Sequence, residues 1–213
     1  MQKVDYNKRM KEIISGLNGK PKLLLHSCCA PCSSSVLSTL QGYFDITVFF
    51  YNPNMDTEKE FVKRQNEEIR LIENLNRENG TDIKIVTCEY NKDEYLSSIK
   101  GLEECEEGGK RCERCFLLRL EKTCQQAKQN NFDFFSTTLS VSPYKNSETL
   151  NKIGHFLEEK HNMKYLYSDF KKEDGYKKSI ELSKKYDLYR QNYCGCEFSR
   201  QEREKVENSL TKQ

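Results

Sequence analysis

The 213-residue chain alternates between short strand-like and longer helix-like segments along its whole length, and this alternation limits the fold more than any other feature. The first helix is predicted from apolar residues at helical spacing between Tyr6 and Leu17, and Gly19 and Pro21 end it before the strand Lys22–His26. Further strands are predicted at Asp45–Tyr51, Asp82–Cys88, Phe132–Thr137 and Tyr165–Tyr167. Helices are predicted between them at Ser33–Leu40, Glu60–Leu75, Cys112–Gln129 and Glu148–Glu159.

This order of elements predicts an α/β fold, in which a parallel sheet has helices on both faces and binds ligands at the carboxyl ends of its strands. No repeat, low-complexity tract or flexible linker interrupts the sequence, so residues 1–213 are expected to form a single domain. Hydrophobic residues make up 36% of the chain and charged residues 32%, which predicts a small core under a heavily solvated surface.

The hydropathy of the sequence also bears on membranes and secretion. The longest apolar run, Ile46–Tyr51, is far shorter than the ~20 residues that a membrane-spanning helix needs. The first twenty residues mix charges into an amphipathic pattern and lack the apolar stretch of a secretory signal. The protein is therefore expected in the cytoplasm, without a membrane partner.

The chain contains ten cysteines, a count that metal binding or redox chemistry explains better than a disulfide framework in a reducing compartment. Seven of them form three groups, which are Cys28, Cys29 and Cys32 after the first strand, Cys112 and Cys115 at the start of a helix, and Cys194 and Cys196 near the C-terminus. Of the other three, Cys88 and Cys124 are expected in the core, and no role is expected for Cys105.

Two of these groups have the spacing of metal ligands. Cys112 and Cys115 are three residues apart, which places both sulfurs on one face of a helix near its N-terminus, where the helix dipole favours thiolates. Cys28 and Cys29 lie in a strand-to-helix turn, where both side chains can curl toward one object larger than a single ion. Together the two pairs supply the four thiolates of a [4Fe–4S] cluster. Four thiolates also suit zinc, so a structural zinc site or simply buried thiols are the alternatives.

The remaining cysteine motifs allow other chemistry. Cys29-Ala-Pro-Cys32 has the CxPC form of a thioredoxin-like dithiol, so a thiol–disulfide oxidoreductase is an alternative function, although it leaves Cys28, Cys112 and Cys115 without a role. Cys194 and Cys196 flank one glycine, and a disulfide across it closes a small ring that is easily reduced. This pair is expected either to carry two electrons or to bind a second metal together with Cys32.

The common nucleotide-binding motifs are absent from the sequence. It has no SGGxDS-like or GxxxxGK[ST] phosphate loop, so activation by a nucleotide is not expected. It has no GxGxxG either, so a bound dinucleotide is not expected as the direct reductant. The segment Thr137–Lys145 carries several hydroxyls and a lysine, a composition that suits phosphate or ribose contact and equally an ordinary loop.

Five short motifs, taken together and in order, closely resemble the QueH-type epoxyqueuosine reductases over about Lys22 to Arg200. The motifs are LLHSCCAPC from Leu24, YNPN from Tyr51, GGKRCERCF from Gly108 with Arg119-Leu120, TTL from Thr137, and YCGC from Tyr193. The resemblance implies a Rossmann-like domain of the HUP type and the last step of queuosine biosynthesis. That step is the two-electron removal of the epoxide oxygen from epoxyqueuosine at the wobble position of a tRNA anticodon.

The resemblance also implies a set of site residues. The [4Fe–4S] ligands would be Cys28, Cys29, Cys112 and Cys115, and Cys194 with Cys196 would form either a redox-active disulfide or ligands to a neighbouring iron. Some relatives have an aspartate in place of Cys32, which leaves its role open. The favoured hypothesis places a mononuclear iron on Cys32, Cys194 and Cys196, because a Lewis acid helps a poor leaving group to depart.

Protons and tRNA contacts complete the expectations. His26 or Tyr51 is expected to supply a proton. Tyr193 is expected to stack on a base, and the candidate phosphate contacts are Lys145, Arg190, Lys171, Lys172, Lys177 and Lys178. The sequence identifies no electron donor, and a zinc-binding module that only binds RNA is the third functional class.

Overall fold

A computed structural model describes residues 4–210 and contains one five-stranded sheet in the order β3-β2-β1-β4-β5. All neighbouring strands are parallel. The strands are β1 (Lys22–Ser27), β2 (Asp45–Phe50), β3 (Lys84–Thr87), β4 (Phe134–Thr137) and β5 (Lys164–Tyr165). Because β1 lies at the centre, the chain changes direction across the sheet beside it, which is where an open α/β sheet binds its ligands. The predicted fold class is confirmed.

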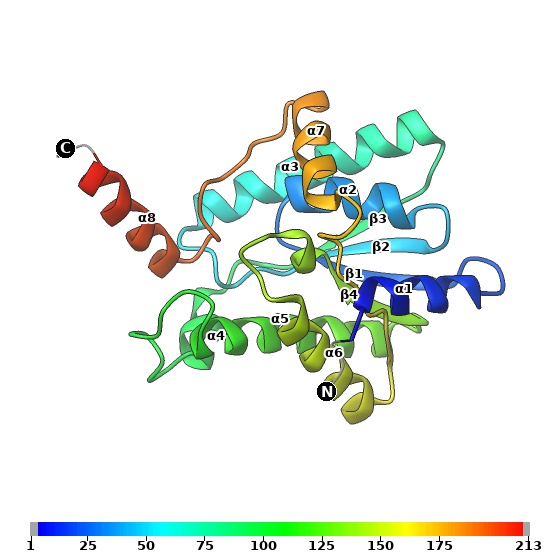
Figure 1. The fold of residues 1–213 in the computed structure, drawn as a ribbon, viewed down its shortest axis with the longest axis horizontal. Helices are drawn as coiled ribbons and strands as arrows, with labels where there is room; N and C mark the ends of the chain where they lie inside the picture. The colour runs from blue at the N-terminus through cyan, green and yellow to red at the C-terminus, as the bar shows by residue number, and fades with distance from the viewer. Residues whose placement is uncertain (1–3, 211–213) are drawn as a thin grey trace.

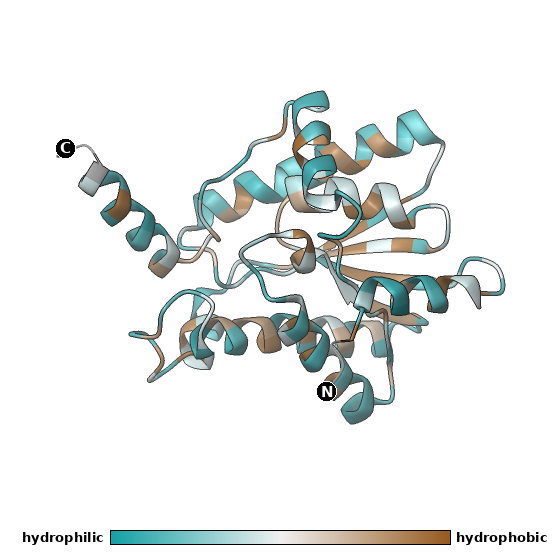
Figure 2. Cartoon of the chain, in the orientation of Figure 1, coloured by the Kyte–Doolittle hydropathy of each residue, from teal (hydrophilic) through white to brown (hydrophobic). Residues whose placement is uncertain are grey.

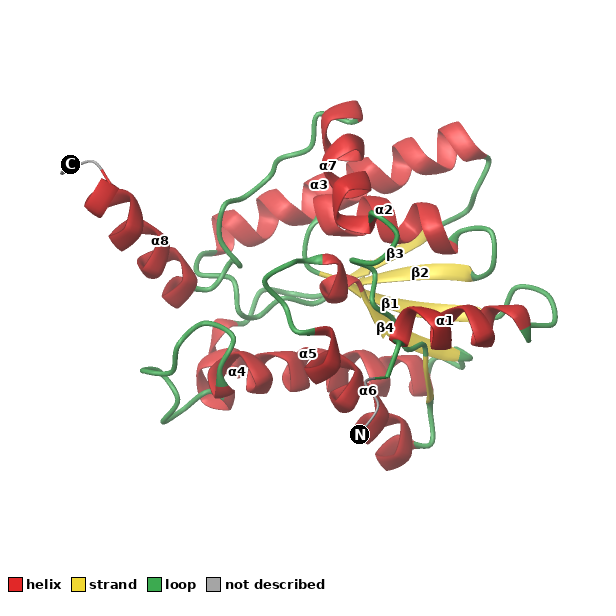
Figure 3. Cartoon of the chain, viewed as in Figure 1, coloured by secondary structure: helices red, strands yellow, loops and turns green. Residues whose placement is uncertain are grey.

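Helices cover both faces of the sheet (Figures 1 and 3). One face carries α2 (Ala30–Leu40), α3 (Glu58–Asn79) and α7 (Gly175–Lys185), and α2 packs on both of the others. On the opposite face, α5 (Lys110–Gln129) contacts β1, β4 and its neighbours α4 (Lys92–Ser98) and α6 (Ser147–His161). The remaining helices are α1 (Tyr6–Ser15), the 3-10 turn η1 (Thr138–Val141) and α8 (Glu197–Leu210), which extends away from the body beyond the sheet.

The central strand divides its side chains between two apolar cores, one on each face of the sheet. Leu23 and Leu25 belong to the core under α2 and α3, whereas Leu24 belongs to the core under α5 and α6. This alternation is the two-residue period of a strand, and it makes β1 apolar on both faces, as a buried parallel strand requires. In Figure 2 the strands are correspondingly mostly brown, and teal is mainly on the helices and loops around them.

The elements differ from the prediction mainly by three additional helices. All five predicted strands and five predicted helices are present, with ends that differ by a few residues. Helices α4, α7 and α8 lie in segments where no element was predicted. Within residues 4–210, no helix combines the length and the apolar character needed to cross a membrane.

Candidate functional site

The first cysteine group lies at the carboxyl end of the central strand, where β1 turns into α2. Cys29 is the residue before α2 and has an extended backbone, with φ −175° and ψ 150°. Its carbonyl accepts hydrogen bonds from the N–H groups of Cys32 and Ser33, both at 3.1 Å, so the first turn of α2 folds back over it. Pro31 in that turn lacks an N–H that the helix would leave unbonded. The turn therefore brings Cys32 back toward Cys28 and Cys29.

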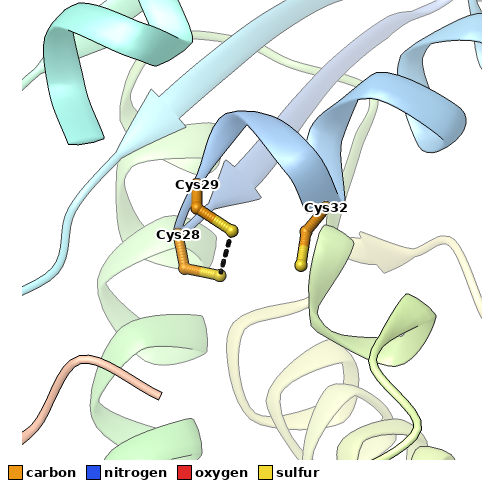
Figure 4. Close-up of side chains that lie close together, drawn as sticks. All are labelled: Cys28, Cys29 and Cys32. Atoms are coloured by element: carbon orange, nitrogen blue, oxygen red, sulfur yellow. Dashed lines mark hydrogen bonds between the residues drawn. The ribbon is translucent and has the colours of Figure 1, made fainter. Parts of the chain in front are cut away.

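The three sulfurs of this turn form a compact group. Those of Cys28, Cys29 and Cys32 all lie within 4.8 Å of one another, and the Cys28 and Cys29 sulfurs are 3.8 Å apart. Figure 4 shows the Cys28 and Cys29 side chains side by side and that of Cys32 reaching toward them from the helix. Cys28 and Cys29 are buried and Cys32 is partly buried. A group of three thiols at this spacing has the donor set of a metal site.

The charge of this group is concentrated on Cys29. Hydrogen bonds from the Cys28 and Cys32 thiols hold the pKa of Cys29 well below its usual range, and the guanidinium of Arg64 favours its thiolate further. The pKa values of Cys28 and Cys32 are raised in return, in each case mainly by the shared hydrogen bonds. The first turn of a helix also favours an anion, so Cys29 is the member of this group that most readily loses its proton.

Cys112 and Cys115 lie in the first two turns of α5, as the i, i+3 spacing predicts. Cys112 packs against the same apolar cluster as Cys28 and Cys29, and its sulfur accepts a hydrogen bond from the N–H of Gly108 at 3.3 Å. Cys115 is buried, and its burial raises the pKa of its thiol to about 11. The compact three-sulfur group contains neither residue. The predicted ligand set of two cysteines from the turn and two from α5 therefore stays a prediction.

Cys194 and Cys196 lie in the loop that precedes α8 and face two different neighbours. Cys194 lines a cavity of about 100 Å³ together with Cys28 and Cys32. Cys196 packs against Cys115 in a small apolar cluster. The CGC motif thus adjoins both the turn after β1 and the start of α5, which are the two segments that carry the predicted cluster ligands.

Gly195 fixes this motif against the body of the protein. Its φ is +118°, a backbone conformation that residues with a side chain rarely adopt. A Cβ atom at this position would lie 2.7 Å from the sulfur of Met55 and 3.1 Å from Nη1 of Arg64. The same Arg64 nitrogen donates to the carbonyl of Cys194 at 3.1 Å, and the Gly195 carbonyl accepts from the N–H of Asp56 at 2.8 Å. The backbone conformation therefore favours glycine between the two cysteines, and a side chain there would also displace Met55 or Arg64.

Two cations, the buried Arg119 and the partly buried Lys145, lie within reach of the charge of several cysteines. Burial lowers the pKa of Arg119, but the negative charges of Cys115, Cys194, Cys28 and Cys112 more than offset this effect, so the pKa is raised. In Lys145 the charges of Cys194, Cys28 and Cys32 likewise outweigh burial. Each cation is therefore within electrostatic reach of cysteines from separate chain segments. Both stabilise thiolates, the form that binds a metal.

The family comparisons agree with these motifs. The model of the family described as "Epoxyqueuosine reductase QueH" matches residues 23–202. The chain belongs to this family. The QueH protein of Streptococcus pyogenes is 39% identical over 201 residues, covering 93% of this chain and 79% of that protein. The QueH protein of Thermotoga maritima is 38% identical over 184 residues, covering 85% of this chain and 91% of that protein.

Membership of the QueH family confirms the predicted oxidoreductase function in queuosine biosynthesis over the thiol–disulfide and zinc-module alternatives. Among solved structures, the U34-tRNA thiolase NcsA from Methanococcus maripaludis, with its [4Fe–4S] cluster, matches with a TM-score of 0.53. It is 15% identical, and the match covers 97% of this chain and 72% of that chain. At this identity the likeness shows a shared fold.

Neither proton source expected for this QueH chain is placed to donate. His26 is fully buried, with Nδ1 3.0 Å from the Thr137 hydroxyl and Nε2 3.1 Å from the Tyr51 carbonyl. Burial lowers the pKa of His26 to about 3, so the ring is neutral and both nitrogens are engaged. The Tyr51 hydroxyl donates to Glu94, and burial together with this bond raises its pKa. Neither residue lines the cavity that contains Cys28, Cys32 and Cys194.

Glu107 is the carboxyl residue that the cavity brings to the cysteines, and the sequence analysis missed it. It lines the cavity with Cys194, and its carboxylate accepts a hydrogen bond from the hydroxyl of Ser199 at 3.2 Å. That hydroxyl in turn accepts from the N–H of Cys194 at 3.1 Å. Glu107 is an exposed residue, but partial burial of its carboxyl and the charge of Cys194 raise its pKa. In the sequence it is indistinguishable from the other acidic residues of the EECEEGG run.

Some of the candidate tRNA contacts line the cavity and the others do not. Lys145, Arg190 and Tyr193 line the cavity. Lys171 instead donates to the carbonyls of Ser140 and Lys145, at 3.0 and 3.1 Å. These bonds connect the two ends of the segment between Ser140 and Lys145. The other predicted lysines lie elsewhere on and before α7, and these are Lys172, Lys177 and Lys178.

Proposed function

We propose that this chain reduces epoxyqueuosine at the wobble position of a tRNA anticodon to queuosine. The epoxide takes up two electrons and two protons, both of its C–O bonds break, a carbon–carbon double bond forms and the oxygen leaves as water. The observation that carries this proposal is the cavity in which Cys28, Cys32 and Cys194 meet Lys145 and Glu107. Three cysteine sulfurs, a cation and a carboxyl group line this one space, and their combination supports the proposal.

We propose a [4Fe–4S] cluster held by Cys28, Cys29, Cys112 and Cys115, and a second iron held by Cys32, Cys194 and Cys196. Two observations support this fit: the 3.8 Å approach of the Cys28 and Cys29 sulfurs, and the raised pKa of Arg119, to which four of the proposed ligands contribute. When bound, these centres would supply electrons one at a time and a Lewis acid for the departing oxygen. If Cys194 and Cys196 act as a redox disulfide instead, no second iron is needed.

The other residues of the cavity have separate tasks in this proposal. Lys145 and Arg119 favour the thiolate of Cys194, because their positive charges help to hold its pKa well below the usual range in spite of burial. Glu107 holds a proton on a carboxyl oxygen at the rim and delivers it to the departing oxygen. Ser199 orients that carboxyl, since its hydroxyl bridges Glu107 and the backbone of Cys194.

Metal analysis combined with nucleoside analysis of treated tRNA tests the function. Protein purified without oxygen should be brown, contain about four irons per chain or slightly more, and convert epoxyqueuosine in tRNA to queuosine when given a chemical reductant. Cys112→Ser should lose both the colour and the conversion, whereas Cys105→Ser should keep both. A colourless active dithiol enzyme, or a zinc protein that leaves the tRNA unchanged, would refute the proposal.

The same preparation separates the two roles proposed for the CGC motif. If Cys194 is an iron ligand, Cys194→Ser should lower the iron content to about four per chain and abolish turnover. If the pair is a redox disulfide, the variant should lose turnover at an unchanged iron content.

A further inference from the structure

The rim of the catalytic cavity displays an aromatic ring that the protein leaves uncovered. Tyr144 is 69% exposed and lies in the loop between η1 and α6, immediately before Lys145. It lines the same cavity as Cys28, Cys32 and Cys194. The large apolar face of a tyrosine gains free energy when a ligand covers it, so a largely exposed ring that lines the cavity of the cysteines is a candidate for contact with the substrate.

An arginine from a distant helix lies over this ring. The guanidinium carbon of Arg203, on α8, is 5.4 Å from the centre of the Tyr144 ring. Arg203 has neither an ion pair nor a hydrogen bond among residues 4–210, although nearby Arg200 is paired with Asp56 and Glu204. A second pair on the same rim repeats the arrangement, with Arg190 5.9 Å from the ring centre of Tyr176. Aromatic rings paired with arginines are the chemistry that binds unpaired nucleotides.

The charges of the rim favour an anionic ligand. Three cations line the cavity, Lys145, Arg190 and Arg203, against the single carboxyl of Glu107. Within the described part of the chain neither Lys145 nor Arg203 forms an ion pair with a carboxylate, although the charge of Cys194 acts on Lys145. A cation over the exposed ring and a second cation at the next position of the chain suit a single strand, in which phosphates alternate with bases.

We propose that Tyr144 and Arg203 form a stacking platform for an unpaired base next to the modified nucleotide, with Arg203 and Lys145 contacting the flanking phosphates. The inference rests on the proposed function, because the base is a neighbour of epoxyqueuosine in the same anticodon loop. The modified nucleotide itself belongs at the cysteines, and Tyr144 is at the exposed rim, so the platform binds its neighbour. A paired base in a helix offers no free face, so the platform selects single-stranded loops.

Binding measurements test the platform separately from catalysis. The probe is a fluorescent anticodon stem-loop RNA with epoxyqueuosine at the wobble position, titrated with iron-loaded protein and followed by anisotropy. Tyr144→Ala should weaken binding about tenfold, since one base–aromatic stack is worth roughly that factor or more. Tyr144→Phe should bind like the wild type, because the ring is kept. Tyr43→Ala is the matched control, because Tyr43 is 49% exposed and lies just before β2, at the opposite end of the strands, and should have no effect.

Two further stem-loops identify the base that stacks. Each lacks one base, on the 5′ or the 3′ side of the modified nucleotide. On one of these RNAs the affinity of the wild type should fall by the same factor by which Tyr144→Ala weakens binding to the intact RNA. The Tyr144→Ala variant should bind that RNA no more weakly than it binds the intact RNA. Equal losses by Tyr144→Ala on all three RNAs, or unchanged binding of this variant to the intact RNA, would overturn the platform.

The salt dependence tests the phosphate contact. Arg203→Gln should reduce the slope of log Kd against log salt by about 0.7, the value for one phosphate contact to a single strand, and an unchanged slope would remove Arg203 from the platform.

The reaction of the wild type with the stem-loop separates the platform from the proposed function. If the wild type binds the stem-loop through Tyr144 but never reduces it, the proposed function fails and the platform stands. If reduction proceeds and Tyr144→Ala binds normally, the platform fails alone.

Discussion

Glu107 differs from its neighbours in the acidic run because its carboxyl lies beside Cys194 and accepts a hydrogen bond from Ser199. We expect Glu107→Gln to lower kcat by about 100-fold, the smaller end of what general acid catalysis contributes, without changing the iron content. Since the pKa of this carboxyl is raised, wild-type activity should fall as the pH rises through it, and the variant should lack that decrease. Pre-steady-state measurements of turnover at a series of pH values give both the loss of kcat and its pH dependence. Glu106→Gln, an exposed neighbour, should behave like the wild type.

Glu68 is a carboxyl group with no access to water, on the face of α3 that packs toward the turn after β1. Neither of its oxygens has a hydrogen bond of good geometry, and burial raises its pKa to about 8, although the hydroxyls of Ser33 and Ser27 lower it in part. The ordinary value is 4.5. Between these two pH values the folded chain holds a proton that the unfolded chain releases, so folding stability falls as the pH rises.

We therefore expect the free energy of unfolding of the metal-free protein to fall by up to about 1.4 kcal/mol per pH unit between pH 5 and 8 from this residue. Glu68→Gln should remove most of that slope, because a neutral amide replaces a group that must keep its proton. Urea unfolding at a series of pH values gives the slopes. Glu73→Gln, on the exposed side of the same helix, should leave the slope unchanged, and an equal effect of both substitutions would contradict the assignment.

At the scale of single residues, the cysteines were predictable and their charged surroundings were not. The group Cys28, Cys29 and Cys32 was visible because a strand-to-helix turn concentrates its side chains. Arg64 is 1% exposed and bonded to Glu60 at 2.6 Å, but in the sequence the pair looks like an ordinary surface ion pair four residues apart on a helix. Burial of a charge depends on the tertiary partners that surround it, and these are far away in the chain.

Among the helices, α6 depends on a glycine for its approach to the sheet. A Cβ atom at Gly154 would lie 2.2 Å from Cε1 of Tyr165, the buried tyrosine at the end of β5. Gly154→Ala should therefore destabilise the protein by about 1–3 kcal/mol, in spite of the better helix propensity of alanine, because the ring or the helix must shift. Chemical denaturation measures the change. Gly42→Ala, where nothing lies within 4 Å, is the control and should stay within about 0.5 kcal/mol.

Strands and long helices were predicted well because burial of their apolar residues is periodic. The exception α7 shows the physical limit of that signal. Its buried residues are Ser179 and Ser183, and it packs on α2, which also buries three serines, Ser33, Ser34 and Ser35. Small polar residues let two helices approach closely, and of the apolar residues of α7 only Leu182 packs against the core under α2. A helix that buries mainly serines has few large apolar residues to mark it in the sequence.

For the molecule as a whole, the proposed metal ligands join segments that the chain separates widely. They come from the turn after β1, from α5 and from the loop before α8. Bound iron would link all three in the folded state and none in the unfolded state, so its removal should cost stability. We expect anaerobic chelation to lower Tm by about 5 °C or more. Hydrogen exchange should rise first in residues 191–199, and an equal Tm with and without iron would contradict the ligand assignment.

The packing of Gly195 against Met55 and Arg64 restricts more than the identity of one residue. Because the carbonyls of Cys194 and Gly195 are both anchored, an inserted or deleted residue would move one cysteine out of register with the rest of the site. Sequence change in the loop around Gly195 is therefore limited to substitutions, and the length of the loop stays constant. When distant homologues are compared, the interval between these two cysteines should be more informative than the residues beside them.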